Sequence, residues 1–284
     1  MISPGKGATP IRVVRYREGE PTPRKDVVAV EEPLEIRIED RVNGSPRIST
    51  ISVTMRTPGD DFLLAAGFLR GEGLIGSAQQ ISEISYCTGD EPQQYNIVVV
   101  RLKSGVEFDP GSLDRNFYMT SSCGVCGKAS LEAVEIQGCT KLPDGDWDLQ
   151  PAILCALPDT LRERQRLFDR TGGIHAAGLF TADGTLLDLR EDVGRHNAVD
   201  KVVGQALLQG ELPLTGRILA VSGRTSFEIM QKALAAEIAV VVAVGAPSSL
   251  AVDLANRFNL TLLGFTRGQG FNVYAGVHRL SEGG

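Results

Sequence analysis

A regular alternation of apolar strands and helices in the second half constrains the fold of this chain more than any other feature. Strands are predicted at residues 174–181, 186–190, 217–221, 238–244 and 260–265, and helices at 157–170, 197–208, 226–237 and 248–256. Strands that alternate with helices pair through right-handed crossovers, which places helices on both faces of one sheet. The second half is therefore predicted to fold as a three-layer α/β/α sandwich.

The first half predicts a smaller unit. Residues 34–38 alternate between apolar and charged side chains, and Asn43-Gly44 predicts a hairpin turn. Further strands are predicted at 48–55 and 95–102, with a helix that opens at Thr57-Pro58. We expect four regions along the chain: a loose N-terminal tail (1–29), a small α+β domain (30–118), a thiol-bearing Cys-x-x-Cys segment and linker (119–156), and an α/β domain (157–284).

Two thiols, Cys123 and Cys126, lie three residues apart in the segment Ser121-Ser122-Cys123-Gly124-Val125-Cys126-Gly127-Lys128. This spacing allows a shared disulfide, a persulfide sulfur or one edge of a metal site. A Cys-x-x-Cys setting, a helix N-terminus and a nearby lysine each lower a thiol pKa, and the thiolate is the reactive form. A serine cap on a helix over 128–134 would supply such an N-terminus. The segment predicts a reactive thiol pair, with a structural zinc half-site or two half-buried cysteines as the alternative.

Charge and composition exclude several classes of protein. The net charge of −6, with no long Lys/Arg block, is unlike that of a sequence-independent nucleic-acid binder. The longest apolar run, 238–244, is too short to span a bilayer, and the N-terminus lacks the apolar core of a signal peptide. Five cysteines, an odd number, do not resemble a secreted disulfide framework. We expect a cytoplasmic protein, in a compartment that keeps thiols reduced.

Polar and glycine-rich segments follow the predicted strands of the second half. They are residues 171–175, 191–197, 222–226, 246–249 and 264–270. Open α/β sheets bind ligands at such strand ends, and a helix N-terminus with an arginine suits a phosphate. Each segment alone is as well explained by a turn and a helix cap. Their occurrence at equivalent positions of one sheet predicts a single phosphorylated ligand.

The three histidines and the remaining cysteines differ in their predicted roles. His196 lies in a polar run and is predicted to belong to the site, whereas His175 fits a core role as well as a functional one. His278, near the C-terminus, is expected at the surface. The remaining cysteines are expected to be packing residues, because none has a thiol or histidine close in sequence: Cys87, Cys139 and Cys155.

Four motifs occur together in the chain: Ser122-Cys123-Gly124-Val125-Cys126-Gly127, Glu191-Asp192-Val193-Gly194-Arg195-His196-Asn197-Ala198-Val199-Asp200-Lys201, Ser222-Gly223-Arg224-Thr225-Ser226-Phe227-Glu228 and Ala246-Pro247-Ser248-Ser249-Leu250-Ala251-Val252. In combination they resemble the formate dehydrogenase accessory sulfurtransferase family, FdhD/NarQ, from about residue 30 onward. The resemblance implies a cytoplasmic, homodimeric sulfurtransferase and chaperone. Such a protein takes persulfide sulfur from a cysteine desulfurase. It passes the sulfur to the molybdenum cofactor, Mo-bis(molybdopterin guanine dinucleotide), before the cofactor enters the formate dehydrogenase catalytic subunit.

The resemblance also implies site residues and a fold. By position, Cys123 matches the family's persulfide-carrying cysteine, and Cys126 either accepts the sulfur or tunes Cys123. The cofactor-binding stretch of the family matches Phe265, Thr266, Arg267, Gly268, Gln269 and Gly270, where the family often has a second basic residue in place of Gln269 or Gly270. The family is similar in fold to cytidine deaminases. This implies a cytidine-deaminase-like three-layer α/β/α sandwich with a smaller N-terminal α+β domain.

Three other functional classes share part of this sequence pattern. A zinc deaminase needs H-x-E and P-C-x-x-C, but the equivalent junctions are His196-Asn197-Ala198 and Ser222-Gly223-Arg224-Thr225, so we expect no zinc. A thioredoxin-like oxidoreductase would carry its thiols after the first strand of a βαβ unit, which is not the pattern here. A molybdenum-cofactor-binding chaperone without thiol chemistry would use the same pocket, and replacement of Cys123 by serine distinguishes it from a sulfurtransferase.

Overall fold

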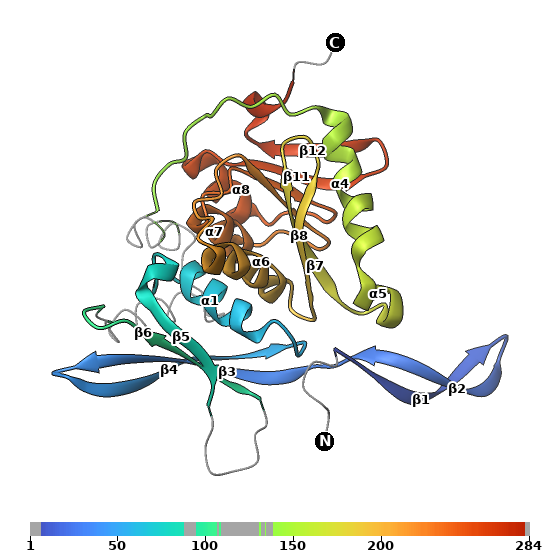
Figure 1. Cartoon of the computed structure of the whole chain (residues 1–284). Helices are drawn as coiled ribbons and strands as arrows, with labels where there is room; N and C mark the ends of the chain where they lie inside the picture. The colour runs from blue at the N-terminus through green and yellow to red at the C-terminus, as the bar shows by residue number, and fades with distance from the viewer. Residues whose placement is uncertain are drawn as a thin grey trace.

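The computed structural model describes residues 7–87, 95–106, 108, 131, 134 and 139–281 (Figure 1). The strands are β1 (Ala8–Arg17), β2 (Glu20–Ala29), β3 (Glu32–Val42), β4 (Ser45–Arg56), β5 (Ile81–Tyr86), β6 (Ile97–Leu102), β7 (His175–Thr181), β8 (Leu186–Asp192), β9 (Arg217–Val221), β10 (Val240–Ala243), β11 (Thr261–Arg267) and β12 (Gly270–Ala275). The helices are α1 (Asp61–Gly71), α4 (Pro151–Arg164), α5 (Arg166–Thr171), α6 (Arg195–Gln209), α7 (Phe227–Ala235) and α8 (Ser249–Phe258), with short 3-10 turns η1 (Ala78–Gln80) and η2 (Val277–Arg279).

A six-stranded sheet with the order β12-β11-β10-β9-β7-β8 forms the centre of the second half. Its three middle strands, β9, β10 and β11, are parallel, and the remaining strands pair antiparallel to their neighbours. Helices α6, α7 and α8 cover one face, and α4 covers the other (Figure 1). The predicted layering of helices on both faces of a mixed α/β sheet is therefore present.

The local sequence explains why these elements form and where they stop. Strand β10 is four small or β-branched apolar residues, all buried, as expected for a central strand covered on both faces. The side chain of Ser248 caps α8 by accepting a hydrogen bond from the amide of Ala251 at 3.3 Å. Asn259 ends the same helix in the left-handed conformation, with φ of 61°. These two residues therefore fix where α8 begins and ends between β10 and β11.

The first predicted helix of the second half begins earlier than expected. The sequence predicted one helix over 157–170, opened by Pro158. In the structure α4 starts at Pro151, Pro158 lies inside it, and a break at Gln165 separates it from α5. Proline at the first helical position lacks an amide hydrogen that the helix would leave unpaired, so Pro151 is a favourable start. The predicted boundary at residue 157 therefore falls within a helix.

A four-stranded sheet with the order β4-β3-β6-β5 forms the smaller unit, and α1 packs on one of its faces. The alternation in β3 buries Leu34, Ile36 and Ile38 against this helix. The predicted turn at Asn43-Gly44 joins β3 to β4, with positive φ at both residues (51° and 79°), as a two-residue hairpin requires. The alternating pattern and the turn were therefore read correctly.

The expected loose tail at residues 1–29 is wrong for residues 8–29. These residues form a ten-pair antiparallel hairpin, β1–β2, that projects from the body (Figure 1). Glu18 and Gly19 make its turn, with φ of 54° and 88°. The hairpin is largely exposed, so the sequence lacks the apolar alternation by which a half-buried strand is recognised. Residues 1–6 lie outside the described part of the chain.

Candidate functional site

The polar segments predicted to meet do gather at one edge of the six-stranded sheet. Strands β9, β10 and β11 are parallel, so their carboxyl ends lie at the same edge. Strand β7 runs antiparallel to β9 and therefore begins at that edge, while β8 ends there. The loops after these strands are residues 193–194, 222–226, 244–248 and 268–269. This edge is where parallel-stranded α/β sheets bind their ligands.

Backbone hydrogen bonds tie two of these loops together. The amide of Thr225 donates to Ala246 at 3.2 Å, and the amide of Ser248 donates back to Thr225 at 3.0 Å. The amide of Gly245 donates to Gly223 at 3.0 Å, and a Cβ on Gly245 would stand only 2.9 Å from the carbonyl oxygen of Gly223. Loops 222–226 and 244–248 are therefore joined by hydrogen bonds into one surface, called the ledge below. Helices α7 and α8 begin directly after these two loops.

A cavity of about 530 Å³ lies at this edge, between the sheet and the α4–α5 pair. Its walls come from α4, α5 and the loop after it, the start of β7, the loops after β8, β9 and β10, and the end of β11; they are Pro158, Asp159, Leu161, Arg162, Gln165, Phe168, Gly172, Gly173, Ile174, His175, Val193, Ser222, Val244, Thr266 and Arg267. Apolar side chains and a few polar groups share the lining, as in small-molecule sites. This volume is within the range of small-molecule pockets.

Two buried polar atoms in the cavity wall have no hydrogen-bond partner within the described part of the chain. They are Nε2 of Gln165 and Oγ1 of Thr266, on side chains that are 3% and 0% exposed. Leaving a buried polar group unpaired costs about 1–3 kcal/mol, so such atoms call for an explanation. Both residues line the cavity, so a polar ligand that displaces the atoms now covering these two groups and hydrogen-bonds to them would remove that cost.

The predicted cofactor stretch, residues 265–270, spans the end of β11, the turn 268–269 and the first residue of β12. Thr266 and Arg267 line the cavity, whereas Phe265 is 43% exposed and Gln269 is exposed on the turn itself. Gly268 adopts φ of 57°, a conformation that favours glycine. The structure therefore brings two of the six predicted residues to the cavity wall and leaves the other four beside it, in β11, the turn and the start of β12.

Two histidines lie at the edge and are neutral near pH 7. Nε2 of His196 is 2.9 Å from Oγ of Ser226 and 3.7 Å from the carboxylate of Glu228. Burial, reinforced by the charge of Arg195, lowers the pKa of His196 from 6.5 to about 4. His175 lines the cavity, and burial likewise lowers its pKa. Both rings therefore act as hydrogen-bonding groups rather than cations.

The third histidine, His278, is 44% exposed and 3.5 Å from Asp144, which agrees with its predicted surface position.

The polar run 191–201 serves a structural purpose that the sequence did not reveal. The carboxylate of Asp192 is fully buried, 2.7 Å from Nζ of Lys201, and accepts from Nδ2 of Asn197 at 2.9 Å. It also accepts from the amide of Thr57, which precedes α1, at 3.2 Å. The side chain of Asn197 donates to the carbonyl of Met55 at 2.8 Å. These residues join the two units rather than contact a ligand.

Glu191, in the same run, fixes one wall of the cavity. Its carboxylate oxygens accept hydrogen bonds from the amides of Leu167 and Phe168, each at 2.8 Å. These are the first-turn amides of α5, which lack partners within the helix. Glu191 thereby holds α5 against β8. Gln165 and Phe168, at the start of this helix, were not predicted as site residues. Gln165 is a single glutamine in a charged helix, without a sequence signal.

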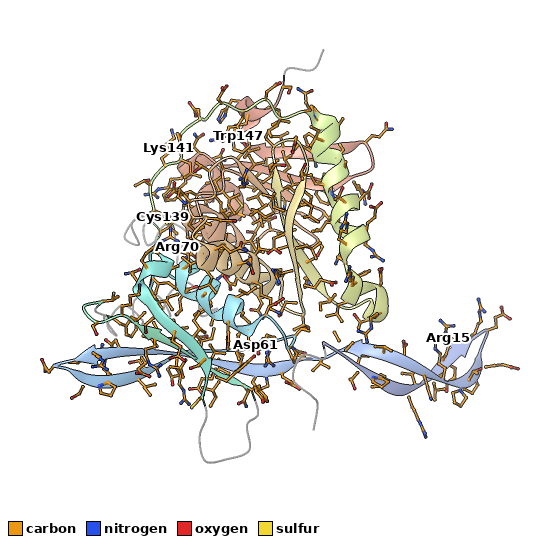
Figure 2. All side chains as sticks on the ribbon, in the orientation of Figure 1. Arg15, Asp61, Arg70, Cys139, Lys141 and Trp147 are labelled. Atoms are coloured by element: carbon orange, nitrogen blue, oxygen red, sulfur yellow. The ribbon has the colours of Figure 1, made fainter. Side chains whose placement is uncertain are left out.

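The predicted thiol pair, Cys123 and Cys126, lies outside the described residues, as does the predicted serine cap. The other three cysteines have the burial expected of packing residues: Cys155 is buried, and Cys87 and Cys139 are half-buried. Burial raises the thiol pKa of Cys139 and of Cys155, which disfavours the reactive thiolate. Figure 2 places Cys139 beside Arg70, whose charge opposes this effect only in part.

The described residues hold neither a cluster suited to a metal ion nor a helix suited to a membrane. Residues 7–87, 95–106 and 139–281, with the few described residues between, hold no cluster of three or more His, Cys, Asp or Glu side chains placed to bind a metal ion. Over the same residues, none of the helices has the length and apolar character needed to cross a membrane.

Comparison with known proteins finds close relatives along nearly the whole chain. The model of the FdhD/NarQ family matches residues 29–281. The chain is 55% identical to the sulfur carrier protein FdhD of Streptomyces avermitilis over 274 residues, covering 95% of this chain and 94% of the relative. It is 48% identical to the protein of the same name from Mycobacterium tuberculosis over 282 residues, covering 96% and 99%.

A solved structure agrees with these relatives. The crystal structure of a protein from Desulfotalea psychrophila, described as a formate dehydrogenase accessory protein, superposes with a TM-score of 0.73 at 27% sequence identity. The superposition covers 96% of this chain and 99% of the other.

Proposed function

Because this chain belongs to the FdhD/NarQ family, we propose that it is a sulfur carrier in the maturation of formate dehydrogenase. In this proposal the chain takes persulfide sulfur from a cysteine desulfurase. It transfers that sulfur to Mo-bis(molybdopterin guanine dinucleotide), which it binds as its substrate, before the cofactor enters the formate dehydrogenase catalytic subunit.

The observation that supports cofactor binding best is the edge cavity with its two unpaired polar atoms, Nε2 of Gln165 and Oγ1 of Thr266. The cofactor ends in guanosine diphosphate groups, which combine a flat base rich in donors and acceptors with two negative phosphates. The base suits a partly apolar cavity with unpaired polar atoms. The phosphates suit Arg267 and the N-termini of α7 and α8 along the ledge.

The thiol step is proposed for Cys123. Its thiolate attacks the outer sulfur of the desulfurase persulfide, a new S–S bond forms on Cys123, and the desulfurase cysteine leaves as a thiolate. No net oxidant or reductant is needed, because one persulfide replaces another. The pair Cys123 and Cys126, followed by Lys128, is a setting that favours a thiolate. In the same proposal Cys126 either accepts the sulfur or tunes the first thiol.

Persulfide formation is tested by mass spectrometry after incubation with a cysteine desulfurase and cysteine. We expect an adduct of about 32 Da, one sulfur atom, on the peptide that carries Cys123. An adduct found only on Cys87, Cys139 or Cys155 would contradict the assignment. The second candidate, a cofactor-binding chaperone without thiol chemistry, predicts that Cys123→Ser keeps full activity in formate dehydrogenase maturation, whereas the sulfur carrier loses it.

Nucleotide binding is tested by calorimetry with guanine nucleotides. We expect GDP to bind more tightly than GMP and guanosine, because the second phosphate engages the ledge and Arg267. Equal affinity for guanosine and GDP would refute the phosphate part of the proposal. The proposal also includes a cytidine-deaminase-like arrangement of the second unit without bound zinc, a cytoplasmic location and a homodimer. Stoichiometric zinc that is lost in a His196 variant would support a hydrolase instead.

A further inference from the structure

The β1–β2 hairpin presents one face that the sulfur-transfer chemistry does not use. Directly opposite residues of an antiparallel pair share a face, so Arg12 with Lys25, Val14 with Pro23, and Tyr16 with Pro21 lie on the same side. Val14 is 57% exposed and Tyr16 is 72% exposed. This side, completed near the base by Pro10 opposite Val27, is called the Tyr16 face below.

Charge on the Tyr16 face has a single sign. Arg12 and Lys25 are directly opposite each other, an arrangement that destabilises a hairpin in water. None of the eight described residues of this face is acidic. The other face differs, because Asp26 and Glu20 occur there among Arg15, Arg17 and Arg24. The Tyr16 face is therefore suited to a surface that is acidic and partly apolar.

The hairpin also has few stabilising contacts with the described rest of the chain. It pairs with no other strand in the described part of the chain, and a two-stranded ribbon alone is marginally stable in water. The body supports its base, where Ala8 is buried and a Cβ on Gly7 would touch Leu167 of α5. Figure 2 shows Arg15 on the outer part, away from the body. A partner that is always present with the chain would bury and stabilise this outer part permanently.

Strand addition is the less favourable way to cover the hairpin. Strand β2 contains Pro21 and Pro23, which lack the amide hydrogens that an added strand would use. Contact through the side chains of a face requires no free edge. The exposed apolar side chains of the hairpin therefore point to a face-on contact.

From these observations we propose that the Tyr16 face docks on the body of a second copy of this chain, so that two copies exchange their hairpins in a homodimer. Residues 8–29 hold five Lys or Arg and three Asp or Glu, a net charge of +2, which leaves −8 for the rest of the chain. The body of a second copy is thus acidic and always present with the hairpin. This inference rests on the homodimer of the proposed function and specifies one of its contacts. It depends on no step of sulfur transfer.

Sedimentation equilibrium of the full chain over a range of protein concentrations tests the contact. We expect a dimer for the natural chain, and a dissociation constant raised at least tenfold, roughly 1.4 kcal/mol, by the paired change Arg12→Glu and Lys25→Glu. The matched control is Arg15→Glu with Arg17→Glu, which alters net charge by the same amount on the other face and should leave the constant within about threefold. Added salt should weaken the natural dimer because the contact is partly electrostatic.

A second variant, Val14→Ser with Tyr16→Ser, keeps the charge and removes the apolar part of the face; it too should raise the constant. Circular dichroism and GDP calorimetry on each variant establish that the body remains folded. A natural chain that stays monomeric refutes the homodimer itself. A dimer that survives both Tyr16-face variants, or that both charge variants weaken equally, refutes the hairpin contact alone. Sulfur loading of Cys123 is unaffected by either result.

Discussion

Gly67 of α1 and Gly204 of α6 lie back to back where the two units of the protein meet. A Cβ on either glycine would stand 2.8 Å from the backbone nitrogen of the other. The same atom on Gly67 would be 1.8 Å from the carbonyl oxygen of Asp200, and on Gly204 it would be 1.9 Å from that of Leu63. The helices therefore approach so closely that only hydrogen fits between their backbones, and the small sheet is fixed to the large one.

We predict that Gly204→Ala destabilises the whole chain. The added methyl meets backbone rather than a mobile side chain, so the helices must separate, and the free energy of unfolding should fall by about 3 kcal/mol or more, the upper end for overpacking. Denaturant unfolding measures this change. Gly173→Ala is the control, since its Cβ would have no atom closer than 3.9 Å, and its effect should be within about 0.5 kcal/mol. Equal effects would refute the close approach.

Strong local patterns predicted the central elements. Strands β9, β10 and β11 are buried apolar runs, and the helices between them have buried faces and, in α8, capping residues. The spacing of their apolar residues and their intrinsic propensities therefore both agree with the fold. The strands missed by the sequence were exposed or at sheet edges: β1, β2, β5 and β12. An edge or projecting strand buries little, so its sequence is not forced to alternate.

The candidate site was predictable in its location and less so in its residues. Parallel strands bring their carboxyl ends together, so the gathering of residues 222–226, 246–249 and 264–270 followed from the order of elements alone. Gln165 could not be found in this way, because it reaches the edge only through the break between α4 and α5. The polar run 191–201 did not reveal its structural role, because a buried ion pair such as Asp192–Lys201 and a ligand site use the same side chains in sequence.

The neutral state of His196 predicts a pH dependence of stability. Its pKa is about 4 in the folded chain and 6.5 as the ordinary value, so the unfolded chain binds more protons between these pH values. The contribution of His196 is therefore fully present above about pH 6.5 and is lost as pH falls toward 4. Relative to His196→Gln, the natural chain should lose about 2–3 kcal/mol of unfolding free energy over that window, measured by urea unfolding.

The outcome that contradicts this assignment is a stability difference that does not change with pH. His196→Asn serves as the control, because it also replaces the imidazole by a neutral amide and should remove the same pH dependence as His196→Gln.

Arg267→Ala should weaken GDP binding and leave sulfur loading intact. Arg267 lines the cavity, and loss of a hydrogen bond to a charged group costs roughly 1.5–3 kcal/mol. Calorimetry measures the first effect, and the rate of persulfide formation on Cys123 measures the second. Arg164→Ala, on the exposed part of α4, should change neither. Collapse of loading with GDP binding retained would overturn the division into a thiol segment and a nucleotide cavity.

Cys126→Ala should separate the two thiols of the proposed carrier. Cys123 should still form its persulfide, because its own thiolate attacks the desulfurase, but delivery of sulfur to the cofactor should slow. Single-turnover transfer from preloaded protein measures the step. Cys139→Ala is the control, because burial raises the pKa of that thiol and disfavours its reaction. Delivery at full rate by the Cys126 variant would assign the chemistry to Cys123 alone.

Thr266→Val changes stability and binding in opposite directions if the cavity takes a polar ligand. Valine has nearly the shape of threonine, and Oγ1 of Thr266 has no hydrogen-bond partner within the described residues, so its removal relieves a cost of about 1–3 kcal/mol. The free energy of unfolding should rise, while GDP binding should weaken by roughly tenfold, because the ligand loses the group left for it. Thr261→Val is the control at the opposite end of β11, since its Oγ1 is equally buried but donates to the carbonyl of Gly276 at 2.8 Å and does not line the cavity. It should lose stability and keep its affinity. A Thr266→Val chain that is more stable and binds GDP as tightly as before would show that this hydroxyl does not serve the ligand.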